Sequence, residues 1–294
     1  MGKIRAFLEL TRPANVITAL SDILAGMAIV GFVFGLKNYQ ISSVLSLGAS
    51  SMCLYAGGVV FNDIFDRKLD AIERPERALP SGRIGLTTAI TGAVLLLGIG
   101  LGLAFYQSRL SGFIAGFIVI LVLLYDWKSK HNGFFGPFNM GMCRAFNLML
   151  GMSVYELGVI ENVQLVIIPL IYIFAITLVS RGEVHGSKPW PLWLAAILFL
   201  IVHSVQINFA LEKQQLIYAL PFILLHAFLI FKPLITAVQN PIGPNIGKTV
   251  KAGVLSLIVM NAAWISTTEQ WYLAILVVAL LPLSIRLGKF FAVT

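Results

Sequence analysis

A long apolar stretch of this chain ends in a charged segment, 61-FNDIFDRKLDAIERPERALPSGRI-84, which holds five of the thirteen acidic residues and five of the twenty-one basic ones. A helix that continues past the apolar stretch places Asp63, Asp66 and Asp70 on one face, because residues at i, i+3 and i+7 are neighbours on a helix surface. Facing carboxylates in a membrane protein need compensation, and a hard divalent cation is the natural one because it prefers carboxylate oxygens. The arginines that follow then hold an anion bound to the same cation, for which a diphosphate is the obvious candidate.

The composition predicts that most of the chain lies in lipid. Of its 294 residues, 58% are hydrophobic and 12% are charged, and the mean hydropathy is +0.89. Ordinary soluble domains carry roughly 25% charged residues. Cys53 and Cys143 lie in apolar segments and are interpreted as small buried side chains, not as a disulfide or a metal site. No cleavage site follows the first apolar run, which is expected to remain as a span.

Ten apolar segments approach the length of about 20 residues that a spanning helix needs. They are 14–36, 41–62, 86–106, 111–126, 135–155, 162–180, 190–210, 214–231, 248–267 and 271–288. Only the polar Ser266–Gln270 separates the last two, so nine and ten spans are both open. The predicted fold class is an all-α integral membrane protein, a nine- or ten-span helical bundle that forms one polytopic domain over 1–294. A central cavity is expected, capped on the cytoplasmic side.

Positive charge predicts the orientation of the bundle. If the N-terminus of a ten-span chain is cytoplasmic, only Lys37, Arg109 and Lys213 fall in outer loops. This asymmetry favours that orientation, with both termini in the cytoplasm and the bundle in the inner membrane of the cell. It also explains the net charge of +8 without a nucleic-acid partner. The polar loops expected on the cytoplasmic side are 63–85, 127–134, 181–189 and 232–247.

The aspartate segment resembles a known motif. The pattern N-D-x-x-D-x-x-x-D followed by R-P-x-x-x-L-P-S-G, over 62–82, is similar to the first aspartate-rich motif of the UbiA superfamily of intramembrane prenyltransferases, and Thr11-Arg12-Pro13 resembles that family's opening. The alternative is a solvated cluster that ends a helix and enforces topology, although topology alone has no need of spaced aspartates. The resemblance implies Mg²⁺ on Asp63, Asp66 and Asp70, gripping the diphosphate of an isoprenoid donor with support from Asn62, Arg67, Lys68 and Arg74.

A second stretch, 179-VSRGEVHGSKPW-190, falls where family members with transferase activity carry a second aspartate-rich motif. Here Glu183 is the only acid, with Arg181 and His185 two residues away on either side. On one interpretation Glu183 is a catalytic, metal-binding carboxylate and Arg181 contacts the diphosphate. His185 then binds either the metal or the diphosphate, although imidazole is a softer ligand than Mg²⁺ prefers. The alternatives are a degenerate loop that no longer supports catalysis and an unrelated turn. The stretch resembles the divergent EboC-like branch of the family.

A third loop, 124-LYDWKSKH-131, occupies the place of the family's Tyr/Lys motif, with Asp126 as a departure from the usual form. Tyr125 and Lys128 are its nearest equivalents, so Tyr125 is expected at the cavity and Lys128 or Lys130 at a diphosphate oxygen. The alternative is an aromatic and basic boundary at the membrane surface.

An arginine inside a predicted span marks a further candidate site. An intramembrane arginine should face an internal cavity and have a partner. Asn147 lies near Arg144 on the same predicted helix, and Asp22 in the first span is the candidate counter-ion. Either Arg144 lines the diphosphate cavity or the acceptor pocket, or the pair holds two helices together. Asn15 and Asp22 share a helix face, so both are expected to look into one cavity.

Other intramembrane residues are interpreted as structural. His203 and His226 are expected to be hydrogen-bonded core residues. Gly141 and Gly151 are expected to permit close helix packing.

The predicted function is Mg²⁺-dependent transfer of an isoprenoid group from a prenyl diphosphate to a small lipophilic acceptor, aromatic or polycyclic, within the membrane. Metal and cations absorb the charge of the leaving diphosphate, and an apolar cavity shields the allylic cation. The base is open between Glu183, Asp126 and Asp70. The competing hypothesis is a non-catalytic membrane binder or transport component for a lipid diphosphate or a related metabolite. The sequence carries no signal for an oligomeric state.

Overall fold

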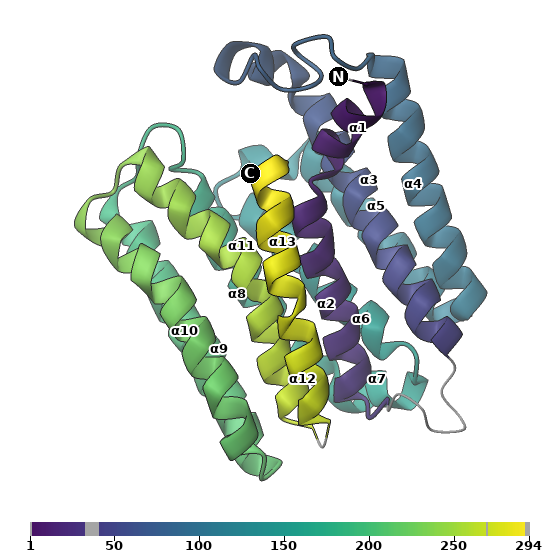
Figure 1. The fold of residues 1–294 in the computed structure, drawn as a ribbon, viewed down its shortest axis with the longest axis vertical. Helices are drawn as coiled ribbons and strands as arrows, with labels where there is room; N and C mark the ends of the chain where they lie inside the picture. The colour runs from purple at the N-terminus through teal and green to yellow at the C-terminus, as the bar shows by residue number, and fades with distance from the viewer. Residues whose placement is uncertain (1, 33–40, 269, 292–294) are drawn as a thin grey trace.

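The computed structural model describes residues 2–32, 41–268 and 270–291, and these residues are helical without a strand (Figure 1). Two short 3₁₀ helices cover Ser129–His131 and Val163–Val166. The α-helices are α1 (Lys3–Thr11), α2 (Pro13–Ile29), α3 (Ile41–Glu73), α4 (Leu86–Gln107), α5 (Arg109–Trp127), α6 (Phe135–Met152), α7 (Glu156–Asn162), α8 (Ile167–Ser180), α9 (Pro189–Glu212), α10 (Leu216–Gln239), α11 (Gly243–Ser266), α12 (Trp271–Val278) and α13 (Leu280–Phe290).

Each predicted apolar segment overlaps a helix of the structure, with differences at the ends. One of these differences is in α10, which continues to Gln239, past the apolar stretch 214–231 and into the predicted loop 232–247. Within the described residues, eight helical stretches are long and apolar enough to cross a membrane, and α2 is a shorter apolar helix. The all-α prediction is confirmed, whereas the choice between nine and ten spans stays a prediction. The end of the predicted span 14–36 lies outside the described residues, as does Lys37.

Two prolines mark where the first and last spanning stretches begin or break. Pro13 occupies the first position of α2, where the missing N–H costs nothing because no partner exists for it inside the helix. The stretch Trp271–Phe290 is divided after Val278. Pro282 accounts for this break, since its ring would clash with the carbonyl of Val278 four residues earlier.

The interior of the bundle is built around α11. Over the most apolar window of each helix, 83% of residues are buried in α11, against 28% in α4 and α10. A buried helix need not be uniformly apolar if its polar groups find partners, and α11 carries Ser256 and Asn261. The outer helices expose large apolar side chains, including Leu95 and Leu224, as expected for a surface that faces lipid.

Close contact between α2 and α6 brings the intramembrane polar residues together. A side chain on Gly26 would collide with the Leu148 carbonyl, and one on Gly151 would collide with the Ile23 carbonyl. Likewise, a side chain on Gly141 would collide with the Leu170 carbonyl of α8. The packing role predicted for Gly141 and Gly151 is confirmed, and it sets the backbone separation that lets α2 and α6 share an ion pair.

The two intramembrane histidines belong to a buried hydrogen-bond chain. His203 Nδ1 donates to the Phe199 carbonyl at 2.7 Å, and His203 Nε2 lies 2.9 Å from His226 Nδ1. His226 Nε2 lies 3.1 Å from the Tyr172 hydroxyl. The prediction that both are hydrogen-bonded core residues is confirmed, and the chain ties α8, α9 and α10 together.

The polar loops meet at one end of the bundle. Arg181 Nη1 donates to the Asn132 carbonyl at 2.8 Å, and the Ser187 amide donates to the Pro241 carbonyl at 3.1 Å. In Figure 1, α1 and the end of α13 lie at this same end of the molecule. The loops that carry the sequence motifs therefore surround one site.

Candidate functional site

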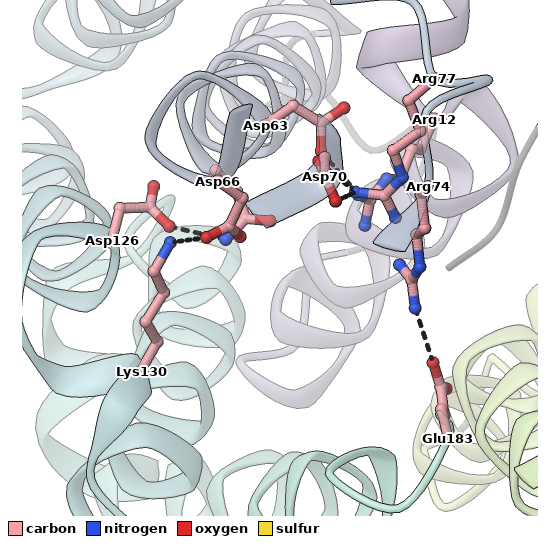
Figure 2. A network of polar contacts seen from close by, with 10 residues as sticks. Arg12, Asp63, Asp66, Asp70, Arg74, Arg77, Asp126, Lys130 and Glu183 are labelled. Carbon is pink, nitrogen blue, oxygen red and sulfur yellow. Dashed lines mark hydrogen bonds and ion pairs between the residues drawn. The ribbon is translucent and has the colours of Figure 1, made fainter. Parts of the chain in front are cut away.

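The aspartates of α3 lie beyond the apolar part of that helix, which continues past the predicted span 41–62 to Glu73, so the first part of the predicted loop 63–85 is helical. At 3.6 residues per turn, Asp63 and Asp70 differ by about 20° around the helix, whereas Asp66 is offset from Asp63 by about 60°. Asp63 and Asp70 are buried, and Asp66 is partly exposed. The three carboxylates share a broad face, but the offset sends Asp66 toward different partners (Figure 2).

Arginines from two other segments neutralise Asp63 and Asp70. The turn after α3 folds back, so that Arg77 Nη1 lies 2.9 Å from Asp70 Oδ2 and 3.4 Å from Asp63 Oδ1. Arg12, at the junction of α1 and α2, brings Nη2 to 2.8 Å from the same Asp63 oxygen. Two guanidinium groups therefore bracket one carboxylate, which gives the site positive groups as well as negative ones (Figure 2).

The loop after α5 supplies partners for the other side of α3. Lys130 Nζ forms an ion pair with Asp66 Oδ1. Asn62 Nδ2 donates to Asp126 Oδ1 at 2.8 Å. Asp126 is almost fully buried, at 2% exposure.

Glu183 reaches the site from the loop after α8. Its Oε2 lies 3.9 Å from Arg74 Nη2, which joins the two motif loops (Figure 2). Its other oxygen, Oε1, is buried and has no hydrogen-bond partner among the described residues. Burial raises the pKa of the Glu183 carboxyl above its ordinary value, and the guanidinium groups of Arg74, Arg12 and Arg77 oppose that rise. A buried carboxylate oxygen without a donor is a ready ligand for a cation.

Two cavities adjoin these residues. The first, called the apolar cavity, lies between α3, α5 and α6 and is lined by Arg12, Ser51, Leu54, Tyr55, Gly58, Val59, Asn62, Ile118, Val122, Tyr125, Asp126, Met140, Cys143, Arg144 and Asn147. The second, called the charged cavity, has Asn15, Asn62, Asp66, Asp70, Arg74, Arg77, Tyr125 and Glu183 in its wall, together with apolar residues of α8 and α11. Asp63 lies in the wall of a neighbouring hollow with Arg12, Arg77 and Glu183. The apolar and charged cavities share Arg12, Tyr55, Asn62, Tyr125, Met140 and Arg144, so they meet.

The intramembrane arginine has the counter-ion that the sequence suggested. Arg144 Nη1 donates to Asp22 Oδ2 at 2.6 Å, and its guanidinium lies over the Tyr55 ring at 4.9 Å. Asn147 donates to the same Asp22 oxygen at 2.8 Å, and Asn261 of α11 donates to the other at 2.7 Å. The two sequence alternatives are therefore compatible, since Arg144 pairs with Asp22 across α2 and α6 and also lines both cavities.

Several predicted diphosphate ligands lie apart from these cavities. Arg67, Lys68, Lys128 and His185 are exposed and are not among the described lining residues. Arg181 is also exposed, and its guanidinium contacts a loop carbonyl. The structure thus gathers Asn62, Arg74 and Arg144 of the predicted set and leaves the other five at the surface.

Three residues of the site were not predicted from the sequence. Arg12 and Arg77 are both within conspicuous motifs, T-R-P and R-P-x-x-x-L-P-S-G, but their partners depend on how α1 and the turn after α3 fold back. Asn261 has only a weak signal, a lone amide in a buried apolar helix, which needs a partner at that depth.

The site has oxygen ligands suited to Mg²⁺, although the described residues form no preformed cluster. Among the residues that the structure describes, no three acidic, histidine or cysteine side chains are grouped to hold a metal ion. Asp63, Asp66, Asp70 and Glu183 nevertheless offer the hard oxygen atoms that Mg²⁺ prefers, and one Glu183 oxygen lacks a partner. A Mg²⁺ ion at this site needs further oxygens from an anion or water.

The fold and the site together define a class of protein. It is an all-helical membrane protein in which carboxylates and arginines gather beside an apolar cavity. The model of the UbiA prenyltransferase family matches residues 23–292. The chain belongs to this family, and with its apolar spanning helices it is an integral membrane protein.

The chain is similar to several archaeal synthases. It is 31% identical over 191 residues to the digeranylgeranylglyceryl phosphate synthase of Ignicoccus hospitalis, over 64% of this chain and 60% of that protein. It is 33% identical over 153 residues to the synthase of the same name from Methanopyrus kandleri, over 50% of this chain and 54% of that protein. The matched parts therefore span between about half and two thirds of these relatives.

Solved structures show the same fold. A UbiA homologue from Archaeoglobus fulgidus bound to GPP and Mg²⁺ superposes with a TM-score of 0.64 at 16% identity, over 86% of this chain and 99% of that one. A UbiA homologue from Aeropyrum pernix gives a TM-score of 0.66 at 12% identity, over 85% and 96% of the two chains.

Proposed function

We propose that this chain is a Mg²⁺-dependent prenyltransferase that moves an isoprenoid group from a prenyl diphosphate to a lipophilic acceptor within the membrane. The observation that carries the proposal is the ion pairing of Arg12, Arg74 and Arg77 with three carboxylates, those of Asp63, Asp70 and Glu183, beside an apolar cavity. A prenyl diphosphate has a multiply charged head and an apolar tail, and few ligands need both surroundings at once.

The proposed roles follow from these positions. Asp63, Asp66, Asp70 and Glu183 would hold Mg²⁺, which supplies positive charge to the diphosphate oxygens when bound. The arginines and Lys130 would exchange their carboxylate partners for the diphosphate and stabilise it as it leaves. Asn62 lies where the cavities meet and would be near the bond that breaks. Tyr55 and the apolar walls would keep water from the allylic group.

For the acceptor we propose a chemical class. The relatives are named as digeranylgeranylglyceryl phosphate synthases, which points to an ether-lipid alcohol. The aromatic or polycyclic acceptor expected from the sequence stays a second possibility for the same site. We also propose that the site faces the cytoplasm, with both termini on that side, and that 1–294 acts as one domain; the asymmetry of lysine and arginine supports the orientation.

The test uses purified protein with Mg²⁺ and geranyl, farnesyl or geranylgeranyl diphosphate, offered with geranylgeranylglyceryl phosphate or with a lipophilic phenol. The measurement is release of diphosphate together with the prenylated product. Activity is expected in the wild type and should be lost in Asp63→Ala and Glu183→Ala. Glu161→Ala is the matched control, since Glu161 is an exposed acid on α7, away from both cavities.

One observation favours a second candidate function, non-catalytic binding of a lipid diphosphate. Each aspartate of α3 that the sequence assigned to metal already has a cation partner, and the second motif loop contributes the single acid Glu183. Tight Mg²⁺-dependent binding of the diphosphates without release, for every acceptor, would support the binder and contradict the transferase.

A further inference from the structure

One carboxylate near the site differs from the others in its partners. Asp63, Asp66, Asp70 and Glu183 each lie within ion-pair distance of an arginine or lysine. Asp126 has no such partner among the described residues and accepts one hydrogen bond, from the neutral amide of Asn62. An ion pair with a cation lowers the proton affinity of a carboxylate and so opposes the effect of burial, whereas a buried carboxylate with a neutral partner has no ion pair to oppose that effect.

The second oxygen of Asp126 is available. Asn62 contacts Oδ1, and no described donor reaches Oδ2. Asp22, another buried acid, is saturated instead, because Arg144, Asn147 and Asn261 occupy both of its oxygens. Glu183 Oε1 and Asp63 Oδ2 also lack a described donor, but both of those carboxylates form ion pairs with arginines. Of the acids near the site, Asp126 alone combines burial and an oxygen free to accept a proton with the absence of an ion pair among the described residues.

The position of Asp126 fits the proposed reaction. Among the described residues it is the only acid in the wall of the apolar cavity. Its partner Asn62 lies at the junction with the charged cavity and is adjacent in sequence to Asp63. The reacting carbon of a prenyl diphosphate joins the charged head to the apolar tail, so it belongs at this junction. A nucleophile that attacks that carbon from the apolar side passes Asp126.

We propose that Asp126 is the catalytic base that takes the proton from the acceptor, and that the acceptor is a lipophilic alcohol that enters the apolar cavity. The inference rests on the proposed prenyl transfer. The alcohol oxygen forms a bond to the first carbon of the prenyl group, and the bond from that carbon to the diphosphate oxygen breaks with its electron pair. The O–H electron pair stays on the acceptor oxygen, and the proton moves to Asp126 Oδ2. A neutral alcohol in a cavity with apolar walls needs a group of the protein to accept its proton.

The test compares Asp126→Asn with Asp126→Glu in single-turnover transfer from geranylgeranyl diphosphate to geranylgeranylglyceryl phosphate. Asparagine keeps an oxygen to accept from Asn62 but is no base, so transfer should fall by about 100-fold or more, the usual contribution of a general base. Glutamate keeps the base and should retain transfer to within about tenfold. Mg²⁺-dependent donor binding should stay within about twofold in both variants, because Asp126 carries no diphosphate contact.

Two results would overturn the proposal. Transfer by Asp126→Asn close to the wild-type rate would show that Asp126 only positions Asn62. Loss of donor binding in that variant would show a structural role. If Asp126→Asn does not fold, Asp126→Ala is measured instead, with and without added formate. Formate should restore transfer in a folded Asp126→Ala, and failure to restore it would contradict the assignment of Asp126 as the base. If the wild type binds the donor but transfers to neither acceptor, the proposed function itself is wrong. If the wild type and Asp126→Asn are both active, only the assignment of Asp126 as the base is wrong.

Discussion

Replacing Asp22 by asparagine should destabilise the bundle far more than removing any neutral member of the same cluster. Asp22 is 1% exposed, and its oxygens accept from Arg144, Asn147 and Asn261. Asparagine keeps the shape but removes the charge that balances Arg144, which is itself only 5% exposed. The variant therefore leaves a buried guanidinium without its counter-ion.

The magnitude separates this effect from an ordinary lost hydrogen bond. Removing one partner of a buried ion pair costs about 3–5 kcal/mol, because the remaining charge is uncompensated. A neutral polar contact between membrane helices is worth about 0.6 kcal/mol on average and about 1.7 kcal/mol at most. Asn261→Ala, which removes one donor to Asp22, should thus cost about 1 kcal/mol. At roughly 2 °C per kcal/mol for a chain of this size, the expected falls in Tm are about 6–10 °C for Asp22→Asn and about 2 °C for Asn261→Ala.

The assay is thermal unfolding in one detergent at a fixed scan rate, followed by tryptophan fluorescence. A cycle with Arg144→Met completes it. Because the double variant Asp22→Asn/Arg144→Met no longer buries a lone charge, it should lose less than the two single variants together. Equal falls for Asp22→Asn and Asn261→Ala, or a strictly additive cycle, would refute the interpretation of this cluster as a buried ion pair.

Three further predictions concern other parts of the molecule. Lys130→Met should weaken Mg²⁺-dependent binding of geranylgeranyl diphosphate about tenfold or more, because Lys130 forms an ion pair with Asp66. The control is Lys128→Met, which should change the affinity less than about twofold because Lys128 is exposed. Equal binding curves for the two variants would contradict this prediction. Gly151→Val should destabilise the protein by about 1–3 kcal/mol or more through collision with α2, whereas Gly116→Val enters open space and should leave Tm nearly unchanged. In EDTA, Tm should fall as pH rises above about 4.3, because the raised pKa of Glu183 lets the folded state hold a proton that the unfolded state has released. Glu183→Gln should make Tm depend less on pH in this range. An unchanged pH dependence in that variant would contradict the assignment to Glu183.

Much of the fold could be predicted because lipid imposes simple requirements. A helix is the only spanning structure that a single apolar segment can form, so the apolar lengths alone locate the helices. The spacing of Asp63, Asp66 and Asp70 likewise predicted one helix face, and the cost of an unpaired intramembrane charge pointed from Arg144 to Asp22.

What escaped prediction depends on contacts between distant segments. Arg77 contacts Asp63 and Asp70 only because the turn after α3 folds back over the helix. Arg67 and Lys68 are exposed, and their role as diphosphate ligands stays a prediction. Lys68 is offset from Asp63 by about 140° around the helix, whereas Arg67 is offset by only about 40° and is exposed all the same. Sequence spacing gives the face of one helix, but the groups opposite that face come from loops whose paths no local pattern encodes.

The most direct measurement is equilibrium binding of a non-reactive geranylgeranyl thiolodiphosphate to the purified protein, with Mg²⁺ and with EDTA. Wild type should bind in Mg²⁺ and lose most of its affinity in EDTA, because on the proposed function the carboxylates of α3 would hold the ion, which would supply positive charge to the diphosphate. Asp66→Asn should lose the Mg²⁺-dependent part while its Tm stays near that of the wild type. Binding that is the same with and without Mg²⁺, or that survives unchanged in folded Asp66→Asn, would contradict the metal-bridged diphosphate site.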